Sequence, residues 1–154
     1  MAKCSIKSDG YAALLAFVLF FISSPNFAHA AALEMRPIED FVAENLDNDQ
    51  SAGLFLSLRC TSLYTIMWKF GTDNKFERAD RFETAATGAL ELAQHFQKPK
   101  NDEYIQTQLK LMAEGYVERW LKAKALTGNF SDDPVIKSDL ATCSQIFGSS
   151  PLKP

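Results

Sequence analysis

LFLSLRCTSLYTIMWKF, residues 54–70, is the stretch that decides the fold. Apolar side chains recur along it at alternating spacings of four and three, the period of an α-helix. This seam consists of Leu56, Cys60, Leu63, Met67 and Phe70. Other apolar residues widen the seam until the polar stripe contains only Arg59, Ser62, Thr65 and Lys69. The stretch predicts a helix from about Asp49 to Gly71 that is the most buried helix of the protein.

Two further helices flank this stretch in the sequence. A short amphipathic helix is expected from Pro37 to about Leu46, because proline fits the first helical position and acidic residues follow it. After the buried helix, Asn74 with Glu77 three residues later is typical of a helix start, and Pro99 ends that second long helix. Its inward seam is rich in alanine, which permits close helix approach.

Capping residues predict two more helices near the C-terminus. Asn101 precedes a helix of about residues 102–126 that Gly128 stops, and Asp133 precedes a helix that ends at Gly148. No segment has the alternating pattern of a strand. The sequence therefore predicts an all-α protein, a four-helix antiparallel bundle with a short extra N-terminal helix, joined by short loops.

The N-terminus has the layout of a cleavable secretory signal. Lys3 and Lys7 precede the uncharged run YAALLAFVLFFI, residues 11–22, and small residues at positions 28 and 30 favour cleavage after Ala30. The run is about 12 residues long, whereas a membrane-spanning helix needs roughly 20, so a permanent span is the weaker alternative. We expect residues 1–30 to be a signal peptide and residues 31–154 to form one helical domain in the periplasm or outside the cell.

The charge of this domain excludes several partners. The full chain has 16 basic and 19 acidic side chains, and Lys3, Lys7 and Asp9 leave with the signal, so 14 basic and 18 acidic ones remain. The net charge near −4, with the signs interspersed, argues against nucleic acid or an anionic membrane as a partner. The short apolar run argues against a stable membrane anchor.

Cys60 and Cys143 are the two cysteines that remain after cleavage. Export carries them into an oxidising compartment, where an even pair usually forms a disulfide. Both lie on the inward seams of their predicted helices, which is the placement that a bridge between helices requires. The sequence predicts a disulfide between them, with two buried free thiols as the alternative.

Catalytic chemistry has little support in the sequence. His95 is the one histidine after the signal, and Glu91 lies one helical turn before it. Their neighbours are polar, so the two read better as a solvated surface pair than as metal ligands. There is no C-x-x-C-H motif for covalent haem. We expect no cofactor, no metal site and no catalytic residue.

Two aromatic pairs, each one helical turn apart, give the best binding hypothesis. If the two helix faces met around a gap, they would line a small apolar pocket with an arginine at its mouth, where it would orient an anionic group. The alternative is a core stripe with polar tips at its edge. The candidate residues are Arg59, Tyr64, Trp68, Tyr116, Arg119 and Trp120.

The stretches LSLRCTSLYTIMWKF (residues 56–70) and DDPVIKSDLATC (residues 132–143), with YVERW between them, resemble small exported helical proteins of bacteria, many of them marine, that carry one cysteine in each stretch. The resemblance covers most of the mature chain through loose motifs. It implies a two-cysteine helical layout, and it implies no activity and no catalytic residues, since that group has none assigned.

The sequence leaves three functions in order. The first is an exported, non-catalytic protein that binds an unknown partner, through an aromatic surface near Trp68 and Trp120. The second is a carrier of a small apolar ligand in a pocket inside the bundle. An enzyme of unknown class comes third, because no nucleophile with a base and no metal cluster can be named.

Overall fold

The computed structural model describes residues 35–44, 47, 49–97, 101–129 and 132–148, and these contain helices and no strand. The helices are α2 (Ile38–Glu44), α3 (Asp49–Asp73), α4 (Asp80–Phe96), α5 (Asp102–Thr127) and α6 (Pro134–Phe147). The all-α prediction is confirmed for this part of the chain. The predicted signal and its cleavage site lie outside the described residues. Within them, no helix is both long enough and apolar enough to cross a membrane.

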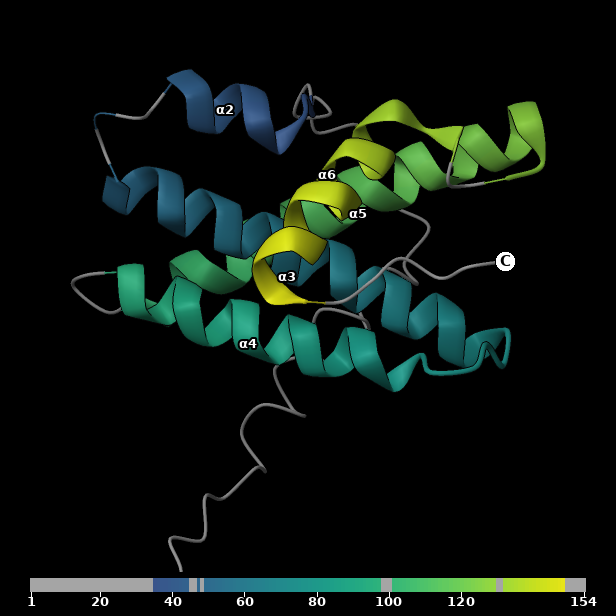
Figure 1. Ribbon diagram of the computed structural model, residues 1–154, viewed down its shortest axis with the longest axis horizontal. Coiled ribbons are helices and arrows are strands. Elements are labelled where there is room, and N and C mark those ends of the chain that lie inside the picture. Colours follow the sequence, from purple (N-terminus) through teal and green to yellow (C-terminus); the bar gives the residue numbers. More distant parts are fainter. Residues whose placement is uncertain (1–34, 45–46, 48, 98–100, 130–131, 149–154) are drawn as a thin grey trace, which may run out of the picture.

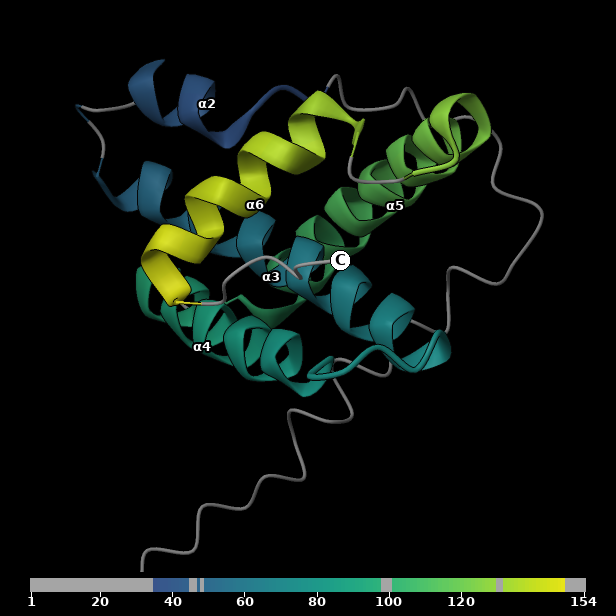
Figure 2. The same ribbon diagram turned by 45° about the vertical axis from the view of Figure 1, so that its right-hand side comes forward.

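Helix α3 lies at the centre of the domain, as the sequence predicted for its most apolar helix (Figures 1 and 2). Three members of its polar stripe, Arg59, Ser62 and Thr65, are buried, and only Lys69 is exposed. The buried hydroxyls have acceptors: Ser62 Oγ donates to the Leu109 carbonyl at 3.2 Å, and Thr65 Oγ1 donates to a carbonyl of its own helix. These bonds offset the cost of removing polar groups from water.

Helices α5 and α6 begin and end where their capping residues predicted. The Asn101 side chain accepts a hydrogen bond from the backbone N–H of Tyr104 at 2.9 Å. The Asp133 carboxylate accepts two from the first turn of α6, at 2.9 and 3.0 Å. At the other ends, Gly128 and Gly148 adopt left-handed φ values of 80° and 71°, which glycine tolerates without strain.

The predicted start of the second long helix was wrong. Helix α4 begins at Asp80, and Ala79 before it has no side chain to cap the first turn. Asn74 instead closes α3, because both its backbone N–H and its Nδ2 donate to the Phe70 carbonyl, at 3.0 and 2.8 Å. The predicted stop at Gly71 was also early, since α3 continues to Asp73.

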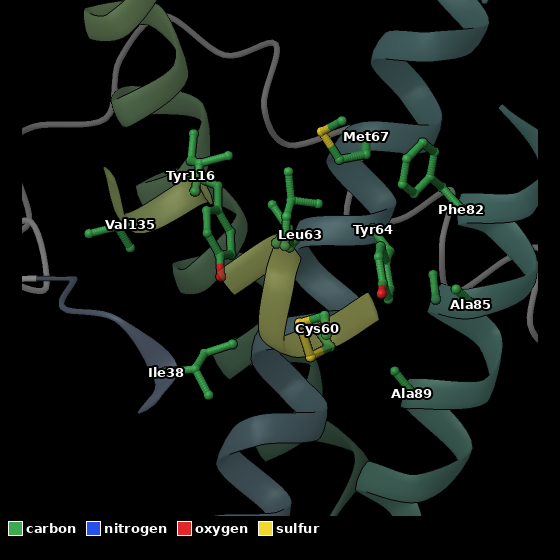
Figure 3. Packing of buried hydrophobic residues seen from close by; sticks show 14 of the residues in the cluster. Ile38, Cys60, Leu63, Tyr64, Met67, Phe82, Ala85, Ala89, Tyr116 and Val135 are labelled. Atoms are coloured by element: carbon green, nitrogen blue, oxygen red, sulfur yellow. A yellow bond between two sulfur atoms is a disulfide. The ribbon is translucent and has the colours of Figure 1, made fainter. Parts of the chain in front are cut away.

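The core joins α3 to its neighbours through apolar side chains and one covalent link. Ala86, Ala89 and Ala93 of α4 are fully buried, which lets α4 pack closely on α3. Cys60 and Cys143 form a disulfide with their Cα atoms 5.5 Å apart, at the centre of the cluster in Figure 3. The predicted bridge between the two helices is confirmed.

The arrangement of the long helices is less regular than predicted. Successive helices alternate in direction from α3 to α6, but α4 and α5 pack mainly on α3 and α6 crosses it obliquely (Figure 2). Helix α2 lies against α3 and α6. The regular four-helix antiparallel bundle is therefore not confirmed by this arrangement.

Candidate functional site

Three of the six candidate binding residues lie together, and three lie elsewhere. Arg59, Tyr116 and Arg119 meet around residues 35–38 of the chain itself. Tyr64 is fully buried on another side of the core, beside Phe82 in Figure 3, with ring centroids 5.8 Å apart. Trp68 and Trp120 are partly buried against the same core. All four residues of the two aromatic pairs therefore belong to the core or pack against it.

Asp139, which the sequence analysis missed, is the centre of a buried polar network. Its side chain is fully buried, and its Oδ2 accepts hydrogen bonds from Arg59 Nη2 and, at 2.5 Å, from the hydroxyl of Tyr116. Its Oδ1 accepts the backbone N–H of Ile38 at 2.8 Å. Three donors from three elements thus converge on one carboxylate, which is how a buried charge is stabilised.

Arg59 and Tyr116 are fixed by this carboxylate rather than poised for a ligand. The guanidinium carbon of Arg59 lies 5.0 Å from the centroid of the Tyr116 ring, within cation–π range. Burial, and next the negative charge of Asp139, raise the pKa of Tyr116 well above its ordinary value. The phenol therefore keeps its proton and acts as a permanent hydrogen-bond donor.

The two arginines bind main-chain carbonyls where the sequence suggested an anionic ligand. Arg59 Nη2 also donates to the carbonyl of Arg36 at 3.1 Å, and Arg119 Nη2 donates to the carbonyl of Met35. Arg119 Nη1 lies 3.2 Å from a carboxylate oxygen of Asp133, the residue that caps α6. The place expected for a ligand holds residues 35–38 of the chain.

A second feature is an aromatic surface at the α3–α4 turn, which we call the Phe76 surface. The Phe70 ring packs edge-on against Phe76 and Trp120, with centroid distances of 5.4 and 5.1 Å, and Lys124 Nζ lies 4.9 Å from the Trp120 centroid. Phe76 is 40% exposed. The surface is defined by Phe70, Lys75, Phe76, Arg78, Trp120 and Lys124.

The backbone of this turn is strained on both sides of Phe76. Lys75 and Arg78 have φ values of 57° and 68°, in the left-handed region that long side chains rarely occupy. Each such residue costs on the order of 1 kcal/mol, and the turn contains no glycine that would remove the cost. This conformation displays an aromatic ring between two basic residues.

A surface groove of about 410 Å³ lies between α4 and the end of α6. Its walls include Arg81, Thr84, Gly88 and Phe147. None of the six candidate binding residues lines it. In the part of the chain that the structure describes, no three His, Cys, Asp or Glu side chains are placed to hold a metal ion.

Comparisons of the chain with protein-family models, with curated proteins and with solved structures find no match.

Proposed function

We propose that this is an exported, non-catalytic interaction protein that docks a partner protein on the Phe76 surface. The observation that supports the proposal is the strained turn, in which Lys75 and Arg78 are left-handed and Phe76 is displayed between them. Backbone strain persists where the surrounding structure enforces it, and it is concentrated at functional sites. Glycine at positions 75 and 78 would adopt the same left-handed φ without the steric cost, so the presence of lysine and arginine there favours a function for their side chains.

The composition of the surface suits a protein partner. Aromatic and arginine side chains are enriched where proteins bind one another, because they bury a large area at a small entropic cost. Phe76 supplies an exposed ring, Phe70 packs edge-on against it, and Trp120 packs edge-on against Phe70. Lys124 and the two basic residues of the turn would steer an acidic or carbonyl-rich face toward the ring.

The test is photocrosslinking in the cells that express the protein. A photoreactive phenylalanine analogue replaces Phe76 in one variant and Tyr104 in a matched control, since both rings are about 40% exposed. We expect a discrete crosslinked species with one protein at position 76 and none at position 104. Phe76→Ser should then weaken binding of the purified partner at least tenfold while leaving the melting temperature within a few degrees.

Equal crosslinking at both positions, or crosslinks at neither, would contradict the proposal that the Phe76 surface binds a partner. A partner bound equally well by wild type and Phe76→Ser would have the same meaning. Tyr104 lies in the first turn of α5, away from the Phe76 surface. Crosslinks from this position therefore report nonspecific contact with neighbouring proteins.

The second candidate is a carrier of a small ligand, and one observation favours it. The groove between α4 and α6 has the volume of a small-molecule site and combines Phe147 with Arg81, an apolar wall with a cation. Gly88 lies in its wall with no heavy atom within 4 Å of an added Cβ. Gly88→Phe would occupy the groove, so it should abolish release of any small molecule on denaturation of protein purified from its own cells; retention would reject the groove as the carrier site.

The cell compartment belongs to this proposal too. It includes a signal peptide at residues 1–30 with cleavage after Ala30, a periplasmic or secreted location, and the resemblance to small exported two-cysteine proteins; the N-terminal pattern Lys3, Lys7 and the apolar run of residues 11–22 supports it. The disulfide is consistent with an oxidising compartment. We also retain the antiparallel four-helix bundle as a proposal for how α3 to α6 are related.

A further inference from the structure

Residues 35–44, which we call the strap, are bound to the rest of the domain through main-chain hydrogen bonds and through buried apolar side chains. Arg119 donates to the carbonyl of Met35, Arg59 donates to the carbonyl of Arg36, and Asp139 accepts the N–H of Ile38. The three side chains that make these contacts come from α5, α3 and α6. Such contacts recognise a backbone rather than a sequence.

The strap also inserts apolar side chains at helical spacing. Met35 and Ile38 are 7% and 0% exposed, and Phe41 stacks on Phe55 of α3 with ring centroids 3.7 Å apart. Gly115 of α5 makes room for Met35, because a Cβ at that glycine would lie 2.2 Å from the Met35 sulfur. The strap thus presents the pattern of an amphipathic helix that binds in a groove, with anchors three residues apart.

The other face of the strap is exposed, and Ser138 Oγ of α6 donates a hydrogen bond to Glu39 Oε1 there at 3.2 Å. Arg36 and Glu44 pair with each other at 2.5 Å, and both residues belong to the strap and are exposed. Detachment of the strap from the domain would therefore not break this ion pair. On the domain side, the Nε of Arg59 is buried and has no hydrogen-bond partner among the described residues, although Arg59 is only 3% exposed. The site therefore contains a donor that the strap does not use.

We propose that the site under the strap binds an amphipathic helical segment of a partner protein, and that the strap is its built-in competitor. The partner segment supplies main-chain carbonyls to Arg59 and Arg119, a main-chain N–H to Asp139, and apolar anchors at two positions three residues apart. A carbonyl aimed at the free Nε of Arg59 would give it an advantage over the strap. This site is separate from the Phe76 surface and does not depend on it.

The test uses the full chain with a weakened strap, Met35→Ser with Ile38→Ser, and a fluorescent peptide with the native sequence of residues 35–44, MRPIEDFVAE. We expect saturable binding to this variant. Binding to wild type should be at least tenfold weaker, because a tethered competitor acts at an effective concentration of order millimolar. Adding Gly115→Leu or Asp139→Asn to the weakened chain should reduce binding at least tenfold, measured in chains that retain their helical circular dichroism and their disulfide.

Changes in the peptide provide matched controls. Ile38→Ser in the peptide should abolish binding, whereas Asp40→Asn, at an exposed position, should change it less than threefold. Absence of binding to a weakened chain that retains its helical circular dichroism and its disulfide would overturn the proposal. So would binding that is indifferent to Gly115→Leu and to Asp139→Asn.

Hydrogen exchange of the wild type tests the proposal without any variant. If the strap is an exchangeable competitor, amides of residues 38–44 should exchange by local opening, faster than amides of α3 near Cys60 by at least a hundredfold. Exchange of both segments at the same rate would mean that the strap leaves only when the whole domain unfolds, and it would overturn the proposal.

Discussion

Arg59 and Asp139 form an ion pair inside the protein, where their side chains are 4% and 0% exposed. Arg59 precedes Cys60 in α3, and Asp139 lies one turn before Cys143 in α6, so the ion pair and the disulfide join the same two helices side by side. Both members of the pair also hydrogen-bond the backbone of the strap: Asp139 accepts the N–H of Ile38, and Arg59 donates to the carbonyl of Arg36. Loss of the pair should therefore affect both the stability of the domain and the attachment of the strap.

Asp139→Asn should destabilise the domain by about 3–5 kcal/mol, because it leaves the guanidinium of Arg59 buried without a counter-charge. Denaturant unfolding followed by circular dichroism measures this change. Asp73→Asn is the matched control, since it breaks the exposed ion pair with Lys69, and it should cost less than about 1 kcal/mol. Equal effects of the two variants would contradict a dominant role for burial.

Replacing both partners should be milder than replacing one. The double variant Arg59→Met with Asp139→Asn removes both charges and keeps an amide oxygen as an acceptor beside Tyr116 and Ile38, so it should regain part of the stability that Asp139→Asn alone loses. A double variant less stable than either single variant would show that the pair is worth more than its desolvation cost.

The disulfide should contribute a large share of the stability. It links residues 83 positions apart, and closing a loop of that length is worth on the order of 4 kcal/mol in the chain-entropy model. Cys60→Ala with Cys143→Ala should lower the free energy of unfolding by about that amount, measured in denaturant at constant pH. If the free energy of unfolding fell by less than about 1 kcal/mol, the helix packing and not the disulfide would supply nearly all of the stability.

The raised pKa of Tyr116 makes stability fall in alkali. The folded protein holds this proton more tightly than the unfolded chain, so the stabilisation is complete below the ordinary tyrosine pKa of 10.0 and is lost as the pH rises above it. Tyr116→Phe should cost about 1.5–3 kcal/mol at neutral pH, and it should flatten the alkaline decline. Tyr104→Phe, at an exposed ring, should leave the decline unchanged, and an equal decline in both variants would contradict the assignment.

Two glycines should respond to alanine in opposite directions. Gly88 lies within α4 with open space around it, so Gly88→Ala should stabilise the domain by about 0.5–1 kcal/mol. Gly128 ends α5 with φ of 80°, so Gly128→Ala should destabilise it by about 1 kcal/mol or more. Thermal melts of both variants measure the two changes in stability. If both changes had the same sign, they would contradict the helical conformation of Gly88 or the left-handed conformation of Gly128.

The helices that were best predicted have strong capping chemistry. Asp133 and Asn101 accept backbone N–H groups at the starts of α6 and α5, and glycines end both helices, so local residues fix these boundaries. Asn74 was misread because an asparagine can also bond the last carbonyls of the preceding helix. The start of α4 depends on packing, since Ala79 offers no side-chain cap.

The buried network was harder to predict than the helices. Arg59 was read as part of a polar stripe, and the sequence alone does not show that the stripe is covered. Asp139 could have been found through the disulfide: it lies one turn from Cys143, and Arg59 adjoins Cys60, so the predicted bridge brings the two charges together. The docking of residues 35–38 is a long-range contact with no local signal.

The most direct test of the whole account is the intact mass of the protein recovered from the cells that make it, before and after reduction with thiol alkylation. We expect a chain that begins near Ala31 and two thiols that are alkylated only after reduction. An uncleaved chain of 154 residues with freely alkylated Cys60 and Cys143 would contradict both export and the disulfide. The proposal of an exported interaction protein would then be wrong.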